Sequence, residues 1–120
     1  MMKCPTCQKT MEISQLHCTG CDISLQGHFS LPRLARLPRE HMRLAEEFLL
    51  CGGNLKDLAA RLGISYPTLR RRVDGMIAAL EAVVAEDRQA ADEILAGIEQ
   101  GRITPEDGLR RVRDLNGEQE

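Results

Sequence analysis

Residues 53–73 read GNLKDLAARLGISYPTLRRRV, two short helical patterns separated by a glycine. Asn54 is a strong N-cap for the first helix, and Gly63 can take the positive φ that a tight turn needs. Ser65 caps the second helix, where Pro67 lies in the first turn and costs no hydrogen bond. The first helix has four apolar residues on one face: Leu55, Leu58, Ala59 and Leu62. A short helix, a tight turn and a capped second helix predict a helix-turn-helix.

A third helix precedes this pair, from about Pro38 to Cys51, and Gly52-Gly53 ends it. Its apolar positions are Leu44, Phe48 and Cys51, with Ala45 and Leu49 alongside. We therefore expect a three-helix domain over residues 39–86. We interpret Cys51 as a buried structural thiol.

The last of these helices has a long apolar stripe with spacings of 4, 3, 4 and 3: Leu69, Val73, Met76, Leu80 and Val83. This is more apolar surface than a three-helix domain needs over its last turns. The excess can pack on the helix from about Pro38 to Cys51 or on a second copy of the chain, and we predict a homodimer.

The chain then turns acidic, and residues 87–116 predict a helical hairpin. An acidic helix from Asp87 to Gln100 ends at Gly101. Thr104 and Pro105 begin the next helix as its cap and first residue. This hairpin is a solubilising or self-pairing tail, or a surface for a protein partner.

Four cysteines form two C-x2-C pairs near the N-terminus, Cys4/Cys7 and Cys18/Cys21, ten residues apart. Such pairs supply a tetrahedral set of four thiolates, which suits zinc, although iron could take the same ligands. Disulfides and a redox C-x-x-C are the alternatives. Four protein ligands leave no open position, so we predict one structural Zn²⁺.

Residues 1–30 therefore predict a small β zinc ribbon, too short to fold by core burial alone. Two stretches alternate as half-buried strands do, residues 11–16 and 23–29. Gln8 and Asp22 follow the cysteine pairs, where a left-handed backbone is common and a non-glycine residue costs roughly 1 kcal/mol. The fold class is thus a β zinc ribbon followed by a mainly α chain. We do not assign His17, His28 or His41 as ligands.

Charge is unevenly distributed. Residues 33–72 hold nine Lys/Arg against four Asp/Glu, whereas residues 74–120 hold five against twelve. The linker 31–38 is basic, and it and the next residue carry Arg33, Arg36 and Arg39 at every third position. These arginines are either a solvated crossover or an arm that contacts phosphates.

The first residues of the second helix in the pair are those that enter the major groove in this motif. The candidate DNA-binding residues are Tyr66, Pro67, Thr68, Arg70, Arg71 and Arg72. Arginines suit phosphates and guanine edges, although three in a row can also be a solvated face. Asp74 would repel phosphate.

No apolar run is long enough to span a membrane, and the N-terminus has no signal segment, so we expect a cytoplasmic protein without a membrane partner. We also expect no enzyme. The sequence contains no Ser/His/Asp set, paired carboxylates or glycine-rich phosphate loop.

Residues 53–73 resemble the helix-turn-helix of Fis-type activator domains in their Gly-Asn, Leu-Gly-Ile-Ser and Thr-Leu pattern. The wider arrangement resembles prokaryotic domain-of-unknown-function family 2089. That likeness rests on the four paired cysteines, the run 31–37 (LPRLARL) and residues 53–73, about two-thirds of the chain. The resemblance implies a zinc ribbon joined to a helix-turn-helix in a transcriptional regulator, and no known ligand, operator or enzyme activity.

Two functions follow from the sequence. The first is a DNA-binding transcriptional regulator with a structural zinc ribbon. The alternative is a protein-binding adaptor or anti-sigma-like regulator that uses the helix-turn-helix fold structurally. A continuous positive face across Arg61 and residues 70–72 favours DNA. A face interrupted by Glu46, Glu47 and Asp74 favours a protein partner.

Overall fold

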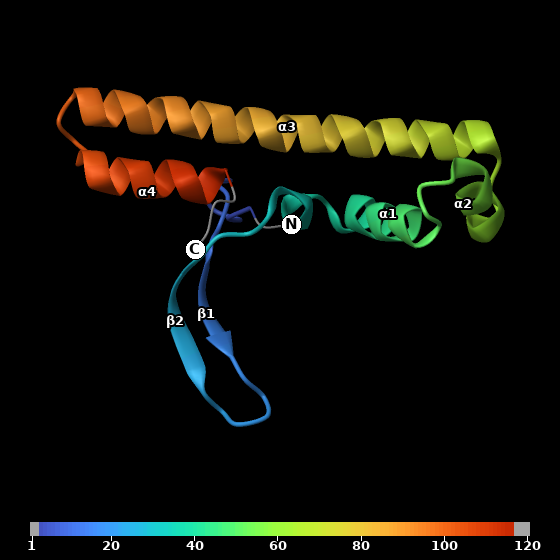
Figure 1. Ribbon diagram of the computed structural model, residues 1–120, viewed down its shortest axis with the longest axis horizontal. Coiled ribbons are helices and arrows are strands. Elements are labelled where there is room, and N and C mark those ends of the chain that lie inside the picture. Colours follow the sequence, from blue (N-terminus) through green and yellow to red (C-terminus); the bar gives the residue numbers. More distant parts are fainter. Residues whose placement is uncertain (1–2, 117–120) are drawn as a thin grey trace. The chain divides into compact units, whose positions relative to one another are not determined.

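A computed structural model describes residues 3–116, so the first two residues of the predicted ribbon lie outside the described part (Figure 1). It confirms the fold class, a two-stranded sheet followed by helices. The elements in chain order are β1 (Ile13–His17), β2 (Ser24–Phe29), a 3-10 turn η1 (Arg33–Arg36), α1 (Arg39–Leu50), α2 (Leu55–Leu62), α3 (Tyr66–Glu99) and α4 (Pro105–Leu115). The chain forms two compact units, residues 33–85 and residues 3–32 with 86–116.

The core of the 33–85 unit is built by α1, α2 and the first half of α3. Leu58 and Leu69 have no exposed surface, and Leu44 is buried with them. Ala59 and Val73 complete this cluster. Six partly buried apolar side chains pack against it: Phe48, Cys51, Leu55, Leu62, Ile64 and Met76. These are the residues that the helical spacing predicts, with Cys51 against the core as expected.

The ends of the short helices confirm the capping chemistry of residues 53–73. The Asn54 side-chain oxygen accepts hydrogen bonds from the backbone N–H groups of Lys56 and Asp57 at 3.0 and 3.2 Å. Gly63 closes α2 at φ 68°, in the left-handed region. The Ser65 hydroxyl accepts from the Thr68 N–H at 3.3 Å and so caps α3. The turn between α2 and α3 is therefore fixed by local hydrogen bonds.

One prediction about helix ends is wrong. We expected a helix to finish near Glu86 and a separate acidic helix to begin at Asp87, but α3 runs unbroken from Tyr66 to Glu99. No glycine or proline lies between residues 76 and 96, so nothing in the chain stops the helix there. Asp87 is also buried, with 3% of its surface exposed, and it has a polar partner within the chain.

The basic linker forms a 3-10 turn with a buried leucine after it, and so is not a fully solvated crossover. Residues 33–36 form the 3-10 turn η1, and Leu37 directly after it is 1% exposed. The Leu37 N–H donates to the Leu34 carbonyl at 3.3 Å, which extends the turn toward α1. The segment thus supplies a core residue that the sequence analysis placed in a linker.

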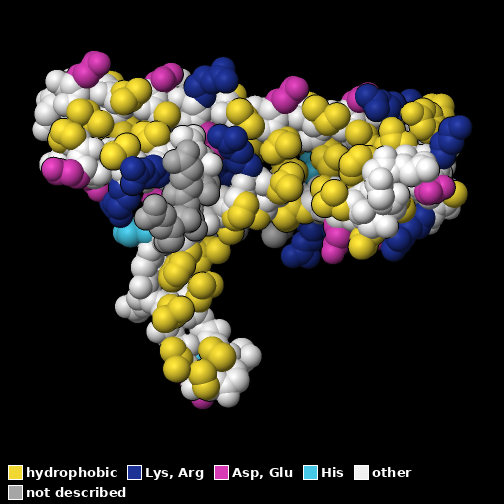
Figure 2. Space-filling model, viewed as in Figure 1, with side chains coloured by type: hydrophobic (Ala, Val, Ile, Leu, Met, Phe, Trp, Pro, Cys, Tyr) yellow, Lys and Arg dark blue, Asp and Glu magenta, His cyan; other side chains and the backbone are white. Residues whose placement is uncertain are grey.

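The second unit contains the β1–β2 hairpin and the α3–α4 hairpin. Strands β1 and β2 are antiparallel, with Leu16 opposite Leu25 and an irregularity between Ile13 and Gln15. Figure 2 shows hydrophobic side chains along this hairpin. Both cross-strand leucines are about half exposed.

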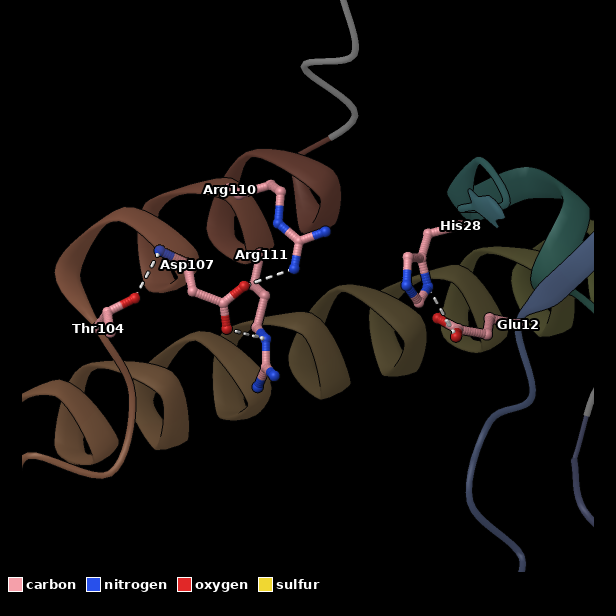
Figure 3. A network of polar contacts seen from close by, with 6 residues as sticks. All are labelled: Glu12, His28, Thr104, Asp107, Arg110 and Arg111. Atoms are coloured by element: carbon pink, nitrogen blue, oxygen red, sulfur yellow. Dashed lines mark hydrogen bonds and ion pairs between the residues drawn. The ribbon is translucent and has the colours of Figure 1, made fainter. Parts of the chain in front are cut away.

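The α3–α4 hairpin is closed by tight packing at glycine. A Cβ placed on Gly108 of α4 would lie 2.9 Å from the Ile98 Cγ1 atom of α3, so only glycine allows the two helices this close. Thr104 caps α4 and Pro105 is its first residue, as predicted. Asp107 then pairs with Arg110 and Arg111 along α4 (Figure 3). Within residues 3–116, no helix is long and apolar enough to cross a membrane.

Candidate metal centre and nucleic-acid interface

The two cysteine pairs are built as identical knuckles. In the first, the Cys4 N–H donates to the Lys9 carbonyl at 2.8 Å and the Gln8 N–H donates to the Cys4 carbonyl at 2.9 Å. In the second, Cys18 donates to Ile23 and Asp22 donates to Cys18 at the same two distances. Each knuckle is therefore a small closed loop that holds its two cysteines near each other.

The residue after each cysteine pair takes the backbone conformation that the sequence predicts. Gln8 has φ 63° and Asp22 has φ 60°, both in the left-handed region. The Asp22 carboxylate lies 3.3 Å from the His17 Nε2 atom, which places a polar contact beside this strained position. His17 Nδ1 also forms a hydrogen bond with the Ser24 hydroxyl at 3.0 Å.

The first thiol of each pair has a lowered pKa. Backbone hydrogen bonds from Cys7 and Thr6 lower the pKa of Cys4 below the usual thiol value. Backbone hydrogen bonds from Cys21 and Gly20 lower the pKa of Cys18 in the same way. A metal binds the thiolate, so both knuckles suit a thiophilic metal such as zinc.

The structure does not bring the two knuckles together. Among residues 3–116, no three Cys, His, Asp or Glu side chains lie close enough to share a metal ion. Cys4 and Cys7 precede β1, whereas Cys18 and Cys21 form the loop at its other end (Figure 1). Each pair fits half of a zinc site by its donor chemistry and its backbone. The predicted set of four ligands remains a prediction.

The candidate DNA-binding residues lie at the exposed start of α3. Tyr66, Pro67 and the three arginines 70–72 are exposed, whereas Thr68 is half-buried. The Thr68 hydroxyl is engaged by the Ser65 hydroxyl at 2.8 Å. At about 100° per residue, Arg71 lies 200° from the buried Leu69 and points away from the core.

Acidic side chains interrupt the positive surface around these arginines. Arg61 of α2 pairs with Glu47 of α1 at 2.9 Å. Arg70 pairs with Asp74 one turn further along α3 at 3.4 Å. Within residues 3–116, Arg71 and Arg72 form no such ion pair. The charges of Arg61 and Arg70 are therefore partly neutralised, and the unpaired positive surface at the start of α3 is limited to Arg71 and Arg72 within residues 3–116.

The predicted basic arm is divided between two elements. Arg33 and Arg36 belong to η1, and each has a partner within the chain. Arg39 is the first residue of α1 and is exposed. The structure does not test whether any of the three contacts phosphate, so this role stays a prediction.

The apolar stripe of α3, from which we predicted a homodimer, is partly covered by other residues of the same chain. Val73 and Val83 are buried, and Met76 and Leu80 are half-buried. Part of the apolar surface that led us to predict a homodimer is thus covered within one chain, and pairing through the end of this helix stays a prediction. Ile77, beside the stripe, remains 43% exposed.

Helix α1 has the two most exposed large apolar side chains among residues 3–116. Leu49, expected alongside the buried stripe, is 69% exposed, and Leu50 is 64% exposed. A helical projection explains this, because Leu49 lies 140° from the core residue Leu44. Sequence reasoning missed this surface by grouping all apolar residues of α1 on one face.

Family models match two parts of the chain, which together end before the second half of α3. Residues 4–35 match the DUF2089 zinc ribbon, and residues 37–83 match the helix-turn-helix of the domain of unknown function DUF2089. The two matches span 32 and 47 residues, 79 of the 120 in the chain. The chain belongs to the DUF2089 family.

The DUF2089 matches agree with the fold, since they place a ribbon over the two knuckles and a helix-turn-helix over α1, α2 and the first half of α3. Both domain types suggest nucleic-acid binding, and the ribbon with its paired cysteines suggests zinc binding. No curated protein and no solved structure matches the chain. The likeness of residues 53–73 to Fis-type domains stays a prediction.

Proposed function

We propose that this DUF2089 protein is a cytoplasmic DNA-binding transcriptional regulator whose zinc ribbon is structural. The observation that carries the proposal is the start of α3. The Gly63 turn and the Ser65 cap fix a helix end on which Arg71 points away from the core. The proposal assigns no catalytic activity to the chain.

The interrupted positive face is compatible with DNA binding on energetic grounds. The side chains in the Arg61–Glu47 and Arg70–Asp74 pairs are roughly one-third to three-fifths exposed. Exposed ion pairs of this kind contribute about 0–1 kcal/mol each. A phosphate can therefore replace the carboxylate partner of Arg70 at little cost, while Arg71 has no ion pair to lose among the described residues.

The zinc ribbon would hold its ion with Cys4, Cys7, Cys18 and Cys21. Zinc supplies a crosslink between two knuckles that are too small to bury a core. The ribbon residues add little positive charge, because Lys3 already pairs with Glu86 at 3.2 Å. We therefore assign the ribbon to structure and the DNA contacts to α3.

Fluorescence anisotropy with labelled genomic fragments at low and moderate salt tests the DNA proposal. If Arg71 contacts a phosphate, Arg71→Ala should weaken binding to every fragment and reduce the salt slope by about one. If it contacts guanine, the loss should be about 1–3 kcal/mol and confined to certain sites. Arg88→Ala is the matched control, since it removes an exposed arginine from the same helix 17 residues further along.

The second candidate function is a protein-binding adaptor, and the ion pairs of Arg61 and Arg70 favour it because they divide the positive face. In that case the start of α3 or the C-terminal hairpin would bind a protein partner. No binding to genomic fragments at low salt, by the wild type or by Asp74→Ala, would refute the DNA proposal and support the adaptor.

A further inference from the structure

Helix α1 has an outer face that a soluble monomer would be expected to make polar. Leu49 and Leu50 are the two most exposed large hydrophobic side chains among residues 3–116. Met42, half-buried, lies two helical turns before Leu49 and therefore on the same side of the helix. Ala45 lies between them and adds no bulk. The outer side of α1 thus has an apolar strip with a small residue at its middle.

The charges beside this strip change sign along the helix. On the side of α1 that carries Leu49, the exposed Arg39 and Arg43 lie before the exposed Glu46. The acidic residue of the first turn, Glu40, lies about 180° from Leu49 and so on the other side of the helix. Arg39, Arg43 and Glu46 form no ion pair with another residue in the range 3–116. Their charges are therefore available to a second molecule.

A second copy of the same helix has the complementary pattern. Two antiparallel α1 helices place the basic half of each beside the acidic half of the other, whereas parallel helices would place like charges together. A two-fold axis near Ala45 brings Leu49 of one copy toward Met42 of the partner subunit. The same axis brings Arg43 toward Glu46 of the partner subunit.

We infer that the chain forms a homodimer in which the α1 helices of two copies pack antiparallel across Ala45. The interface is isologous, so each contact occurs twice. The interface is formed by the outer face of α1, and the apolar stripe of α3 makes no contact across it. The inference does not depend on DNA binding, and its test uses no DNA.

Sedimentation equilibrium of the full chain between about 1 and 100 μM tests this interface. The wild type should have the mass of two chains at the higher concentrations. Leu49→Glu should raise the dissociation constant about a hundredfold or more, because two buried leucines are lost per dimer. Ile77→Glu is the matched control: it adds the same charge at another exposed apolar position, on α3, and should leave the dimer intact.

A charge exchange separates a true antiparallel pair from a general effect on folding. Arg43→Glu and Glu46→Arg should each give single chains, because each variant places like charges together twice. A 1:1 mixture of the two variants should associate, since every contact then joins opposite charges. All of these positions are exposed, so helical circular dichroism should be unchanged. A wild-type mass of one chain at 100 μM, or no association in the mixture, would overturn the inference.

Discussion

Two glycines in helices offer a direct test of the packing described above, because alanine should have opposite effects at them. Gly75 in α3 has room for a methyl group, because a Cβ there would meet only the His41 Cε1 atom at 3.7 Å, an ordinary van der Waals contact. At Gly108 in α4, a Cβ would lie 2.9 Å from Ile98 Cγ1 and 3.4 Å from Ile94 Cγ2. Both substitutions gain helix propensity, but only the second forces atoms to move.

The magnitudes follow from these distances. Replacing a mid-helix glycine by alanine gains roughly 0.8–1 kcal/mol of helix stability. Gly75→Ala should keep most of this gain. Overpacking a tight contact costs about 1–3 kcal/mol, so Gly108→Ala should lose up to about 2 kcal/mol overall. Separation of α4 from α3 is the expected response, since α4 has only 11 residues and is marginal alone.

Hydrogen–deuterium exchange resolved by segment measures both effects in the full chain. In Gly108→Ala, the amides of residues 105–115 should exchange up to about thirtyfold faster than in the wild type. In Gly75→Ala, the amides of α3 around residue 75 should exchange more slowly. Protection of the α4 amides in Gly108→Ala equal to or greater than that in the wild type would contradict the close packing of α3 and α4 at this position.

Three further predictions address the metal, the charge network and the α3 stripe. Purified protein should contain about one zinc per chain by metal analysis, and Cys18→Ser should lose the metal while keeping the helical circular dichroism; full zinc retention would contradict the ligand assignment. The hydrogen bond from Arg110 lowers the pKa of the Asp107 carboxyl group in the folded chain. The ionised Asp107 therefore stabilises the fold above the ordinary carboxyl pKa, and this stabilisation is lost as the pH falls through the lowered pKa. Helicity should therefore decline below about pH 4, and Asp107→Asn should reduce that decline in an acid titration. Leu80→Glu should lower the free energy of unfolding by about 1–3 kcal/mol, because it places a charge at a half-buried apolar position of the 33–85 unit. If this variant instead remained fully stable and changed only from two chains to one, the dimer seam would lie on α3.

The sequence was sufficient to predict those features of the structure that depend on residues close together in the chain. The caps at Asn54 and Thr104 and the turn at Gly63 were all predicted because each depends on one side chain and its own backbone. The left-handed conformations of Gln8 and Asp22 followed from their place after a cysteine pair. Local chemistry also located the start of α3, and with it the candidate DNA-binding residues.

The predictions that failed concern which face of a helix or turn is buried against other parts of the chain. Leu37 looked like part of a solvated linker, yet it is buried. The change from apolar to acidic composition near Glu86 suggested a helix end, but charge alone does not stop a helix. Leu49 was grouped with core residues because it is apolar, although its helical angle places it outside. Whether the two cysteine pairs share one ion likewise depends on tertiary placement, which spacing alone does not determine.

The hydroxyl pair at the start of α3 has a consequence for how selective the protein can be. The Ser65 and Thr68 hydroxyls form a hydrogen bond with each other at 2.8 Å, so only part of the hydrogen-bonding capacity of Thr68 is left for a DNA base. If α3 enters the major groove as proposed, discrimination between base pairs would depend mainly on Tyr66 and on the long Arg71 side chain, which can donate to many partners. A regulator built this way would occupy a broad and graded set of genomic positions, and a short consensus would describe its targets poorly. Thr68→Val, which removes the hydroxyl and keeps the shape, should leave that distribution almost unchanged.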